Sequence, residues 1–268
     1  KHPYHLVDPS PWPLVTAGSL LILAYGFISF MHDEKSLLFA IGSIALIISS
    51  FLWWRDVVSE SEGGKFHNKV VVIGLRYGMI LFIASEVMFF AAWFWAFFDV
   101  AFYPGGDSQE LIGRQEALGG VFPPEEIELI PPFGIPLLNT FILLASGGTV
   151  TWAHHALREN DRKNFLIFLF LTIVLGVVFT GFQGYEYLHA TFSIDEGIYP
   201  STFYMATGFH GAHVIIGTIF LIVCFFRGVR GHFKPEKHLG FEFAAWYWHF
   251  VDVVWLFLFT FVYWWASV

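Results

Sequence analysis

The chain has 268 residues, of which 56% are hydrophobic and only 13% are charged, and its formal net charge is -8. Soluble domains carry about 25% charged residues, so this composition excludes an ordinary soluble domain and indicates a membrane protein. The basic residues form no block that would indicate nucleic-acid binding. The single cysteine, Cys224, excludes an internal disulfide and a metal centre built from cysteines alone.

Seven apolar stretches follow one another along the chain, each close to or above the roughly 20 residues that cross a bilayer as a helix. They predict an all-α membrane protein with a single domain over residues 1–268 and helices at about 13–31, 36–54, 70–98, 135–157, 164–188, 199–226 and 240–266. Only the sequence HDEK separates the first two stretches, which predicts a tight helical hairpin. The connection 99–134 contains PGG, LGG and PP, which favour an ordered surface loop rather than a helix.

The distribution of lysine and arginine predicts the orientation in the membrane. If there are seven spans, 12 of the 14 basic residues fall on one side: Lys1, Arg55, Lys65, Lys69, Arg76, Arg158, Arg162, Lys163, Arg227, Arg230, Lys234 and Lys237. The opposite side keeps Lys35 and Arg114, together with Asp107, Glu110, Glu116, Glu125, Glu126, Glu128, Asp195 and Glu196. We therefore expect the N-terminus on the cytoplasmic or matrix side, and the C-terminus on the periplasmic or intermembrane side.

The third stretch carries one carboxylate, Glu86, near its middle. A charge at that depth is expensive unless it is protonated, paired or hydrated, so an intramembrane acid is by default a functional hypothesis. The residues three and four positions away are Phe82, Ile83, Phe89 and Phe90, and none of them can pair with a charge. The alternative is a neutral acid that is hydrogen-bonded inside the bundle.

Two helix ends carry polar residues that favour a structural interpretation. His154 and His155 are adjacent and point about 100° apart on a helix, so they cannot easily face one metal, and interfacial hydrogen bonding is favoured. At the end of the fifth span, Glu186 and His189 are expected to reach water among the lipid headgroups.

The sixth and seventh spans carry polar pairs at helical spacing. His210 and His213 share a face, and Arg227 lies roughly four turns, or about 21 Å, further along the same side. An arginine at the interface suits a lipid phosphate, but it can equally extend toward water without a ligand. His249 and Asp252 lie on one face of the last helix, where packing between helices is favoured over a metal site or a proton relay.

These residues leave two function classes open. A retinal protein needs a lysine in the last span, and residues 240–266 contain none. A haem or copper enzyme would need membrane histidines as ligands, and those present are scattered at mixed depths. A proton or ion carrier that uses Glu86, and an accessory subunit that binds lipid and packs on a redox partner, both fit the spacing.

Eight motifs, in order from about residue 4 to residue 266, resemble cytochrome c oxidase subunit III of the mitochondrial and alphaproteobacterial type. They are YHLVDPSPWP, WWRDV, RYGMILFIASEVMFFAAWFWAF, PLLNT, WAHHA, DRK, STFYMATGFHGAHVIIGTIFLIVCFFR and GFEFAAWYWHFVDVVWLFLF. The first hairpin and the loop 99–130 diverge, and the length of that loop favours a bacterial inner membrane over the mitochondrial inner membrane.

The resemblance implies a two-helix group and a five-helix group with a phospholipid-binding cleft between them. It implies that this chain has no metal, no redox cofactor and no catalytic residues of its own, with haem a, haem a3 and copper in partner subunits I and II. The complex would oxidise cytochrome c, reduce O2 to water and pump protons, while this chain stabilises subunit I and supports proton uptake and sustained turnover. A supercomplex with the cytochrome bc1 complex is compatible with this assignment, and quinol oxidase subunit III is the nearest alternative.

The resemblance also assigns roles to particular residues. Glu86 matches the family's buried carbodiimide-reactive glutamate, and the residues that match lipid-lining positions are Trp53, Trp54, His210, His213 and Arg227, with Glu86 beside them. His249 and Asp252 match the last helix, where packing is the expected role.

Overall fold

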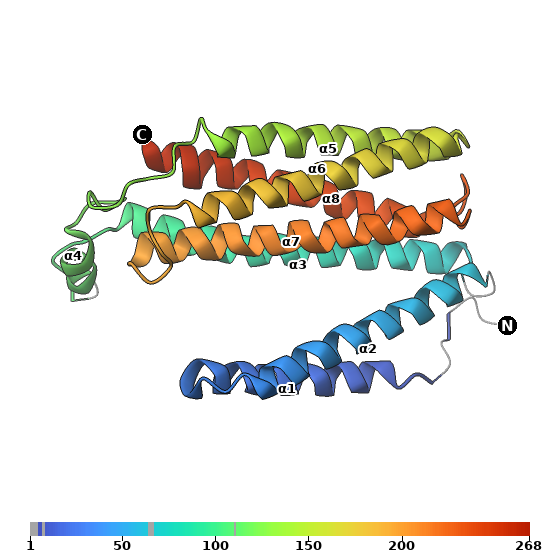
Figure 1. The fold of residues 1–268 in the computed structure, drawn as a ribbon, viewed down its shortest axis with the longest axis horizontal. Helices are drawn as coiled ribbons and strands as arrows, with labels where there is room; N and C mark the ends of the chain where they lie inside the picture. Colours follow the sequence, from blue (N-terminus) through green and yellow to red (C-terminus); the bar gives the residue numbers. More distant parts are fainter. Residues whose placement is uncertain (1–4, 7–8, 64–66, 110) are drawn as a thin grey trace. The chain divides into compact units, whose positions relative to one another are not determined.

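The structure is a computed structural model that describes residues 5–6, 9–63, 67–109 and 111–268 (Figure 1). In this part of the chain every regular element is a helix, and seven of the helices are long and apolar enough to cross a membrane. The long helices are α1 (Trp12–Asp33), α2 (Leu37–Glu62), α3 (Lys69–Phe102), α5 (Ile135–Arg158), α6 (Arg162–Leu188), α7 (Ile198–Val229) and α8 (Leu239–Phe257). The prediction of an all-α membrane protein with seven spans is confirmed.

Several helices extend beyond the apolar stretches that predicted them. Helix α2 continues to Glu62, eight residues past the predicted end at 54, and α3 continues to Phe102. Hydropathy marks only the part of a helix that lies in hydrocarbon, whereas the backbone hydrogen bonds continue into polar turns. Helix α8 continues as a π-helical segment, Leu258–Trp264 (η1), and a short 3-10 turn, Trp265–Ser267 (η2).

The expectation that residues 99–134 contain no helix is wrong. A seven-residue helix, α4 (Ile112–Leu118), lies within this connection. Its sequence, IGRQEAL, consists largely of good helix formers, and Gly119 ends it in the left-handed conformation at φ 64°. The glycines and prolines around it mark where the helix begins and ends and do not exclude it.

The chain divides into two compact units, Lys1–Tyr77 and Gly78–Val268. The prediction of one domain over residues 1–268 stays a prediction. In the first unit, α1 packs against α2, so the predicted hairpin is confirmed. A Cβ atom at Gly26 or Gly42 would overlap the backbone of the opposite helix, which is the close approach that small residues allow between membrane helices.

In the second unit, the helix backbones approach closely in the pairs α5–α6, α6–α7, α7–α8 and α5–α8. Trp248 and Trp255 of α8 are fully buried among them. Their indole N–H groups donate to Ser146 Oγ at 2.8 Å and Thr140 Oγ1 at 2.9 Å, both on α5. In a membrane such close packing and interhelical hydrogen bonds, rather than apolar burial, drive the association of helices.

Large aromatic rings connect α3 to the other helices of this unit. Phe89 and Trp93 both pack on Phe209 of α7, with ring centroids 5.0 Å apart in each case, and Phe90 lies 6.0 Å from Phe250 of α8. Aromatic side chains span more distance than the small residues between α5 and α6, so they can hold α3 against this bundle with its backbone further away.

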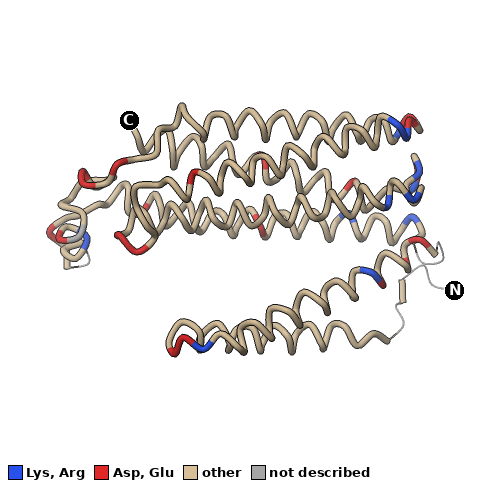
Figure 2. The backbone as a smooth tube through the Cα atoms, in the orientation of Figure 1, with Lys and Arg blue, Asp and Glu red and all other residues tan. Residues whose placement is uncertain are grey.

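Charged residues separate to the two ends of the second unit. Figure 2 shows Lys and Arg gathered where α5 meets α6 and α7 meets α8, and most Asp and Glu at the other end. Arg114 lies at this second end, where it pairs with Asp99 at 2.5 Å. We call the two ends the basic end and the acidic end. Lys1, Lys65 and Glu110, which contributed to the orientation argument, lie outside the described residues, and the compartment that each end faces stays a prediction.

Candidate functional site

Glu86 of α3 and His213 of α7 form a polar pair inside the second unit. Glu86 Oε2 lies 2.9 Å from His213 Nε2, and the side chains are 22% and 12% exposed. The sequence indicated that Glu86 needs a partner, a proton or water, and the structure shows a partner. That partner is 127 positions away along the chain and on another helix, so helical spacing around Glu86 gave no signal for it.

The hydrogen bonds of His213 define where the protons of this pair lie. Nδ1 of His213 is 2.6 Å from the carbonyl oxygen of Phe209. A carbonyl oxygen only accepts, so Nδ1 carries a hydrogen, and one further hydrogen lies between Nε2 and Glu86 Oε2. The pair is therefore either a carboxylic acid with a neutral imidazole or a carboxylate with an imidazolium, and it is neutral overall in both forms.

The surroundings of the pair are aromatic. The imidazole ring of His213 lies 4.9 Å from the Phe90 ring in an edge-on arrangement and stacks on Tyr247 at 6.3 Å. In such surroundings, the loss of one partner would leave a polar group unsatisfied, at a cost of about 1–3 kcal/mol.

His210 has different hydrogen-bond partners from His213. It is 1% exposed, its Nε2 lies 3.1 Å from the carbonyl oxygen of Val251 on α8, and its ring packs on Trp255 at 5.2 Å. Positions three apart are about 60° apart around a helix, so the two rings share a broad face of α7 but have different partners, Glu86 of α3 for His213 and Val251 of α8 for His210. The assignment of His210 to a lipid surface stays a prediction, and its observed contacts are with protein.

Arg227 lies at the basic end, far along α7 from His213. Its guanidinium carbon lies 4.7 Å above the ring of Phe233, and a Cβ atom at Gly240 would come within 2.7 Å of its Nη1. The side chain therefore lies across the connection between α7 and α8. His213 and Arg227, which the sequence placed on one side of α7, do not form one cluster.

Trp53 and Trp54 belong to the first unit, on α2. Trp53 is half-buried and Trp54 is 65% exposed. Close to them, Asp56 accepts a 2.6 Å hydrogen bond from the indole of Trp12, which connects the start of α1 to α2.

His249 and Asp252 share a face of α8, as predicted, and that face meets α5. His249 Nε2 lies 3.1 Å from Thr151 Oγ1. A Cβ atom at Gly147 would overlap the Asp252 carboxylate and lie 3.6 Å from His249 Nδ1. Both residues contact α5, and the expected role of this pair in packing between helices stays a prediction.

The adjacent histidines at the end of α5 diverge, as their spacing predicted. His154 Nε2 lies 3.2 Å from Nε2 of His238, just before α8, while His155 approaches Glu159 at 3.7 Å. The predicted hydrogen bonding is observed for His154, and its place at the membrane interface stays a prediction. Within the described part of the chain, no group of three or more His, Cys, Asp or Glu side chains could hold a metal ion.

The expectation that Glu186 reaches water at a helix end is wrong for its side chain, which is 4% exposed. Glu186 Oε1 accepts hydrogen bonds from the hydroxyl of Tyr263 at 2.7 Å and from Gln183 Nε2 at 3.1 Å. Tyr263 belongs to the π-helical end of the last span, so the contact depends on how that distant segment packs. His189 is exposed, as expected.

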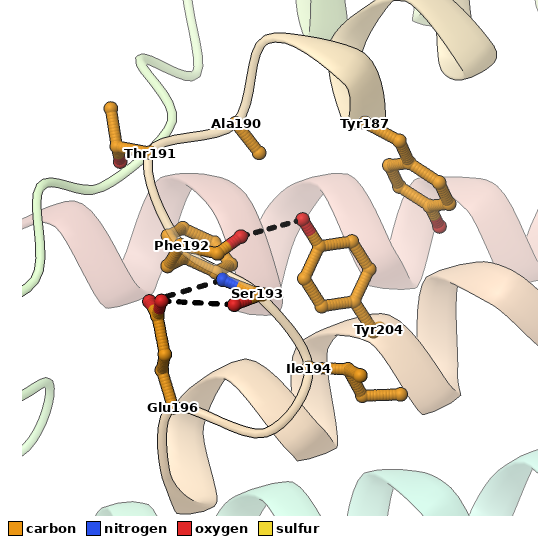
Figure 3. A pocket seen from close by; sticks show the side chains of 8 residues that line it. All are labelled: Tyr187, Ala190, Thr191, Phe192, Ser193, Ile194, Glu196 and Tyr204. Atoms are coloured by element: carbon orange, nitrogen blue, oxygen red, sulfur yellow. Dashed lines mark hydrogen bonds between the residues drawn. The ribbon is translucent and has the colours of Figure 1, made fainter.

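Two hollows lie at the acidic end, and Glu186 lines the smaller of them. Figure 3 shows the larger, an open hollow of about 500 Å³ in which Tyr204 donates to the carbonyl of Phe192 at 2.9 Å and Ser193 binds Glu196 through its N–H and hydroxyl. The smaller cavity, of about 270 Å³, is lined by residues 128–131, 135, 136, 186 and 189–191. The polar side chains of the larger hollow all have hydrogen-bond partners in the protein, whereas the smaller one has in its wall a buried acid with an oxygen that no described residue partners.

Comparison with known proteins identifies the family. The family model for cytochrome c oxidase subunit III matches residues 2–267. This chain belongs to the cytochrome c oxidase subunit III family. It is 53% identical over 269 residues to cytochrome c oxidase subunit 3 of Prototheca wickerhamii, covering 100% of this chain and 99% of the relative.

Relatives in other lineages are similarly close. A probable cytochrome c oxidase subunit 3 of Rickettsia bellii is 56% identical over 267 residues, covering 98% of this chain and 95% of the relative. Cytochrome c oxidase subunit 3 of Equus asinus is 52% identical over 266 residues, covering 99% and 98%. As a member of this family, the chain is a subunit of cytochrome c oxidase, an oxidoreductase complex, and the resemblance inferred from its motifs is confirmed.

Proposed function

We propose that this subunit III is an accessory subunit without its own redox centre, which binds phospholipids, stabilises subunit I and supports proton uptake and sustained turnover. Haem a, haem a3 and copper belong to subunits I and II in this proposal, and cytochrome c is the electron donor. We place the chain in a bacterial inner membrane, with the mitochondrial inner membrane as the alternative, and its N-terminus on the cytoplasmic or matrix side.

The half-buried Glu86–His213 pair is the observation that best supports an accessory role. A pair that is neutral overall can lie beside hydrocarbon at a low cost, while its residual exposure leaves it within reach of a bound molecule. The aromatic rings of Phe89, Trp93 and Phe209 next to it offer flat apolar surfaces for acyl chains.

Arg227 supports the phosphate part of the proposal. A guanidinium binds a phosphate through two parallel hydrogen bonds, and a basic residue near a helix end is where an anionic lipid headgroup lies. The position of Arg227 in the last turn of α7, over the Phe233 ring, suits this interaction. On the first unit, the exposed indole of Trp54 would contact lipid independently.

The test combines Arg227→Ala with Trp54→Ala in the intact oxidase. We expect less retained phospholipid and a shorter working life under turnover, with little change in the initial electron-transfer rate. The matched control is Arg230→Ala with Trp152→Ala, which removes an exposed arginine and an exposed tryptophan elsewhere. A working life equal to wild type after full loss of lipid would contradict the proposal.

A proton carrier built around Glu86 is the second candidate, and the single hydrogen between Glu86 and His213 favours it. A relay needs a second site to which the proton can move. The variant Glu86→Gln tests this candidate because it removes the carboxyl that would carry the proton. We expect proton pumping to be largely intact in this variant. Complete loss of pumping with normal oxygen consumption would establish the carrier instead.

A redox difference spectrum tests the absence of a redox centre in this chain. We expect haem a absorbance in the purified complex that leaves with subunits I and II when the partners are stripped away. Haem that stays with this chain would make its membrane histidines ligand candidates and would contradict the proposal.

A further inference from the structure

The acidic end of the second unit contains a buried acid with only neutral partners. Oε1 of Glu186 is bound by Tyr263 and Gln183, but among the described residues nothing partners Oε2, although that atom is shielded from solvent. A buried carboxylate without a cation is costly, and the hydroxyl and amide that bind Glu186 carry no charge. The group therefore needs either a proton or a cation at Oε2.

The cavity of about 270 Å³ offers a space through which a proton or a cation could reach Glu186. Glu186 forms part of its wall, together with Ile135 and Pro136 at the start of α5 and with His189 and Thr191. This volume has room for several water molecules, which can hydrogen-bond a buried polar atom. Water in this cavity would lie against the Glu186 side chain, close to the buried carboxylate.

Further unpartnered polar atoms of α5 and α6 lie at one level of the bundle, that of Gln183. Thr149 on α5 lies 2.8 Å from Thr172 on α6, which sets the antiparallel register of the two helices. Ten residues back along α5 and eleven forward along α6, Asn139 and Gln183 come to the same height. Asn139 is 0% exposed, and within the described part of the chain neither of its amide atoms, nor Gln183 Oε1, has a hydrogen-bond partner.

Each unsatisfied buried polar group costs about 1–3 kcal/mol, so several at one level are expected only where water or an ion completes their hydrogen bonds. The π-helical turns that bring Tyr263 to Glu186 are a backbone irregularity that often occurs at functional sites. The groups around Glu186 therefore form a polar site, and not only a packing contact.

We propose that Glu186 is a proton-binding site, which exchanges its proton with the aqueous phase at the acidic end through this water-filled cavity. A proton is favoured over a metal ion because one carboxylate with neutral amides provides few ligands, and the described residues contain no metal-binding group. The step is reversible: the carboxylic acid releases a proton to cavity water and becomes a carboxylate, and takes the proton back from hydronium.

The groups that face Glu186 fit this role. Tyr263 of η1, Tyr187 of α6 and Tyr204 of α7 interact with it electrostatically, and Glu128 and His189 line the cavity. None of these five side chains is a lysine or an arginine.

Infrared difference spectroscopy on the intact oxidase tests the proposal. We expect the carbonyl-stretch band of a protonated carboxylic acid that decreases as pH rises and shifts in D2O. The band should be absent in Glu186→Gln and present in Glu128→Gln, which changes an exposed carboxyl at the same cavity. In Glu186→Asp, which keeps the acid, a displaced band should persist if the glutamine variant does not assemble.

A second variant tests the route through the cavity. Ile135→Phe fills part of the cavity and leaves Glu186 in place, so exchange of the band in D2O should slow by about tenfold, corresponding to an added barrier of about 1.4 kcal/mol. Ile194→Phe, the same change in the larger hollow of Figure 3, is the control and should leave the rate unchanged.

Four results would overturn the proposal. A band that persists in Glu186→Gln would place the protonated acid elsewhere. A band that changes with neither pH nor D2O would show that Glu186 does not exchange its proton with water. A wild-type band that disappears on addition of Mg²⁺ or Ca²⁺ at constant pH would make the site a metal site. Equal exchange rates in Ile135→Phe and wild type would exclude the cavity as the route.

Discussion

Gly147 of α5 is the position where one added methyl group tests the packing of α5 against α8. A Cβ atom there would overlap the Asp252 carboxylate, whereas a Cβ atom at the next residue, Gly148, would have nothing within 4 Å. Alanine at these two adjacent positions is therefore the same chemical change with and without a steric conflict. Both residues are in the middle of a helix, so their backbone contexts are matched.

The expected magnitudes follow from two opposing effects. Glycine to alanine in a helix interior stabilises the helix by about 1 kcal/mol, and this gain applies to both variants. Overpacking in a closely packed interior costs about 1–3 kcal/mol and applies only to Gly147→Ala. We therefore expect Gly148→Ala to raise the free energy of unfolding, and Gly147→Ala to be less stable than it by about 1–3 kcal/mol.

The assay is denaturation of the isolated chain in mixed detergent micelles, followed by the fluorescence of its 11 tryptophans. Asp252→Ala removes the carboxylate that the new methyl group would meet, so in that background Gly147→Ala should lose its penalty. Equal stability of the Gly147→Ala and Gly148→Ala variants would refute the reasoning. An unchanged penalty after Asp252→Ala would show that another group causes the conflict.

Two more predictions concern single polar contacts of the same unit. Trp248→Phe removes the N–H that donates to Ser146 Oγ and leaves a void where the indole was. It should lower the free energy of unfolding by about 1–3 kcal/mol. Trp152→Phe, at an exposed position, should change the free energy of unfolding little in the same micelle assay. Asp161→Ala should destabilise the start of α6, because the Asp161 carboxylate accepts from the backbone N–H of Asn164, and this hydrogen bond holds the pKa of that carboxyl below its usual value. Because the pKa is lowered, the stabilisation is complete above the ordinary aspartate pKa of about 3.9 and is lost as pH falls through the lowered value. Wild type and Asp161→Ala should therefore become equally stable in acid. A difference in stability that persists in acid would contradict the capping role.

The helices could be predicted from the sequence because hydropathy reports directly on bilayer thickness. The same signal could not reveal α4, since a helix of seven residues outside the hydrocarbon has no apolar stretch to mark it. It also placed the end of α2 too early, because Arg55 and Asp56 are polar and helical at once. Length in hydrocarbon and length of helix are separate quantities, and the sequence pattern measures only the first.

For the polar residues, positions on the same helix could be predicted from the sequence, whereas partners on another helix could not. Residues on one helix face, such as His249 and Asp252, were identified from their spacing, and so was the divergence of His154 from His155. The partner of Glu86 could not be inferred, because helical periodicity says nothing about which residue of another helix lies opposite.

Two membrane acids of the second unit, Glu86 and Glu186, are stabilised in opposite ways, which determines how each should respond to its surroundings. Glu86 has a basic partner on a half-exposed aromatic face, so lipid or detergent at that face can change the pair without any change in total charge. Glu186 has neutral partners and a cavity at the acidic end, so its charge can change only with a proton or cation that arrives through water. A change of lipid composition should therefore alter the wild-type enzyme and leave Glu86→Gln less affected, while a change of pH at the acidic end should act on Glu186 in both. An enzyme whose response to lipid is the same with and without the Glu86 carboxyl would show that the pair is only a packing contact.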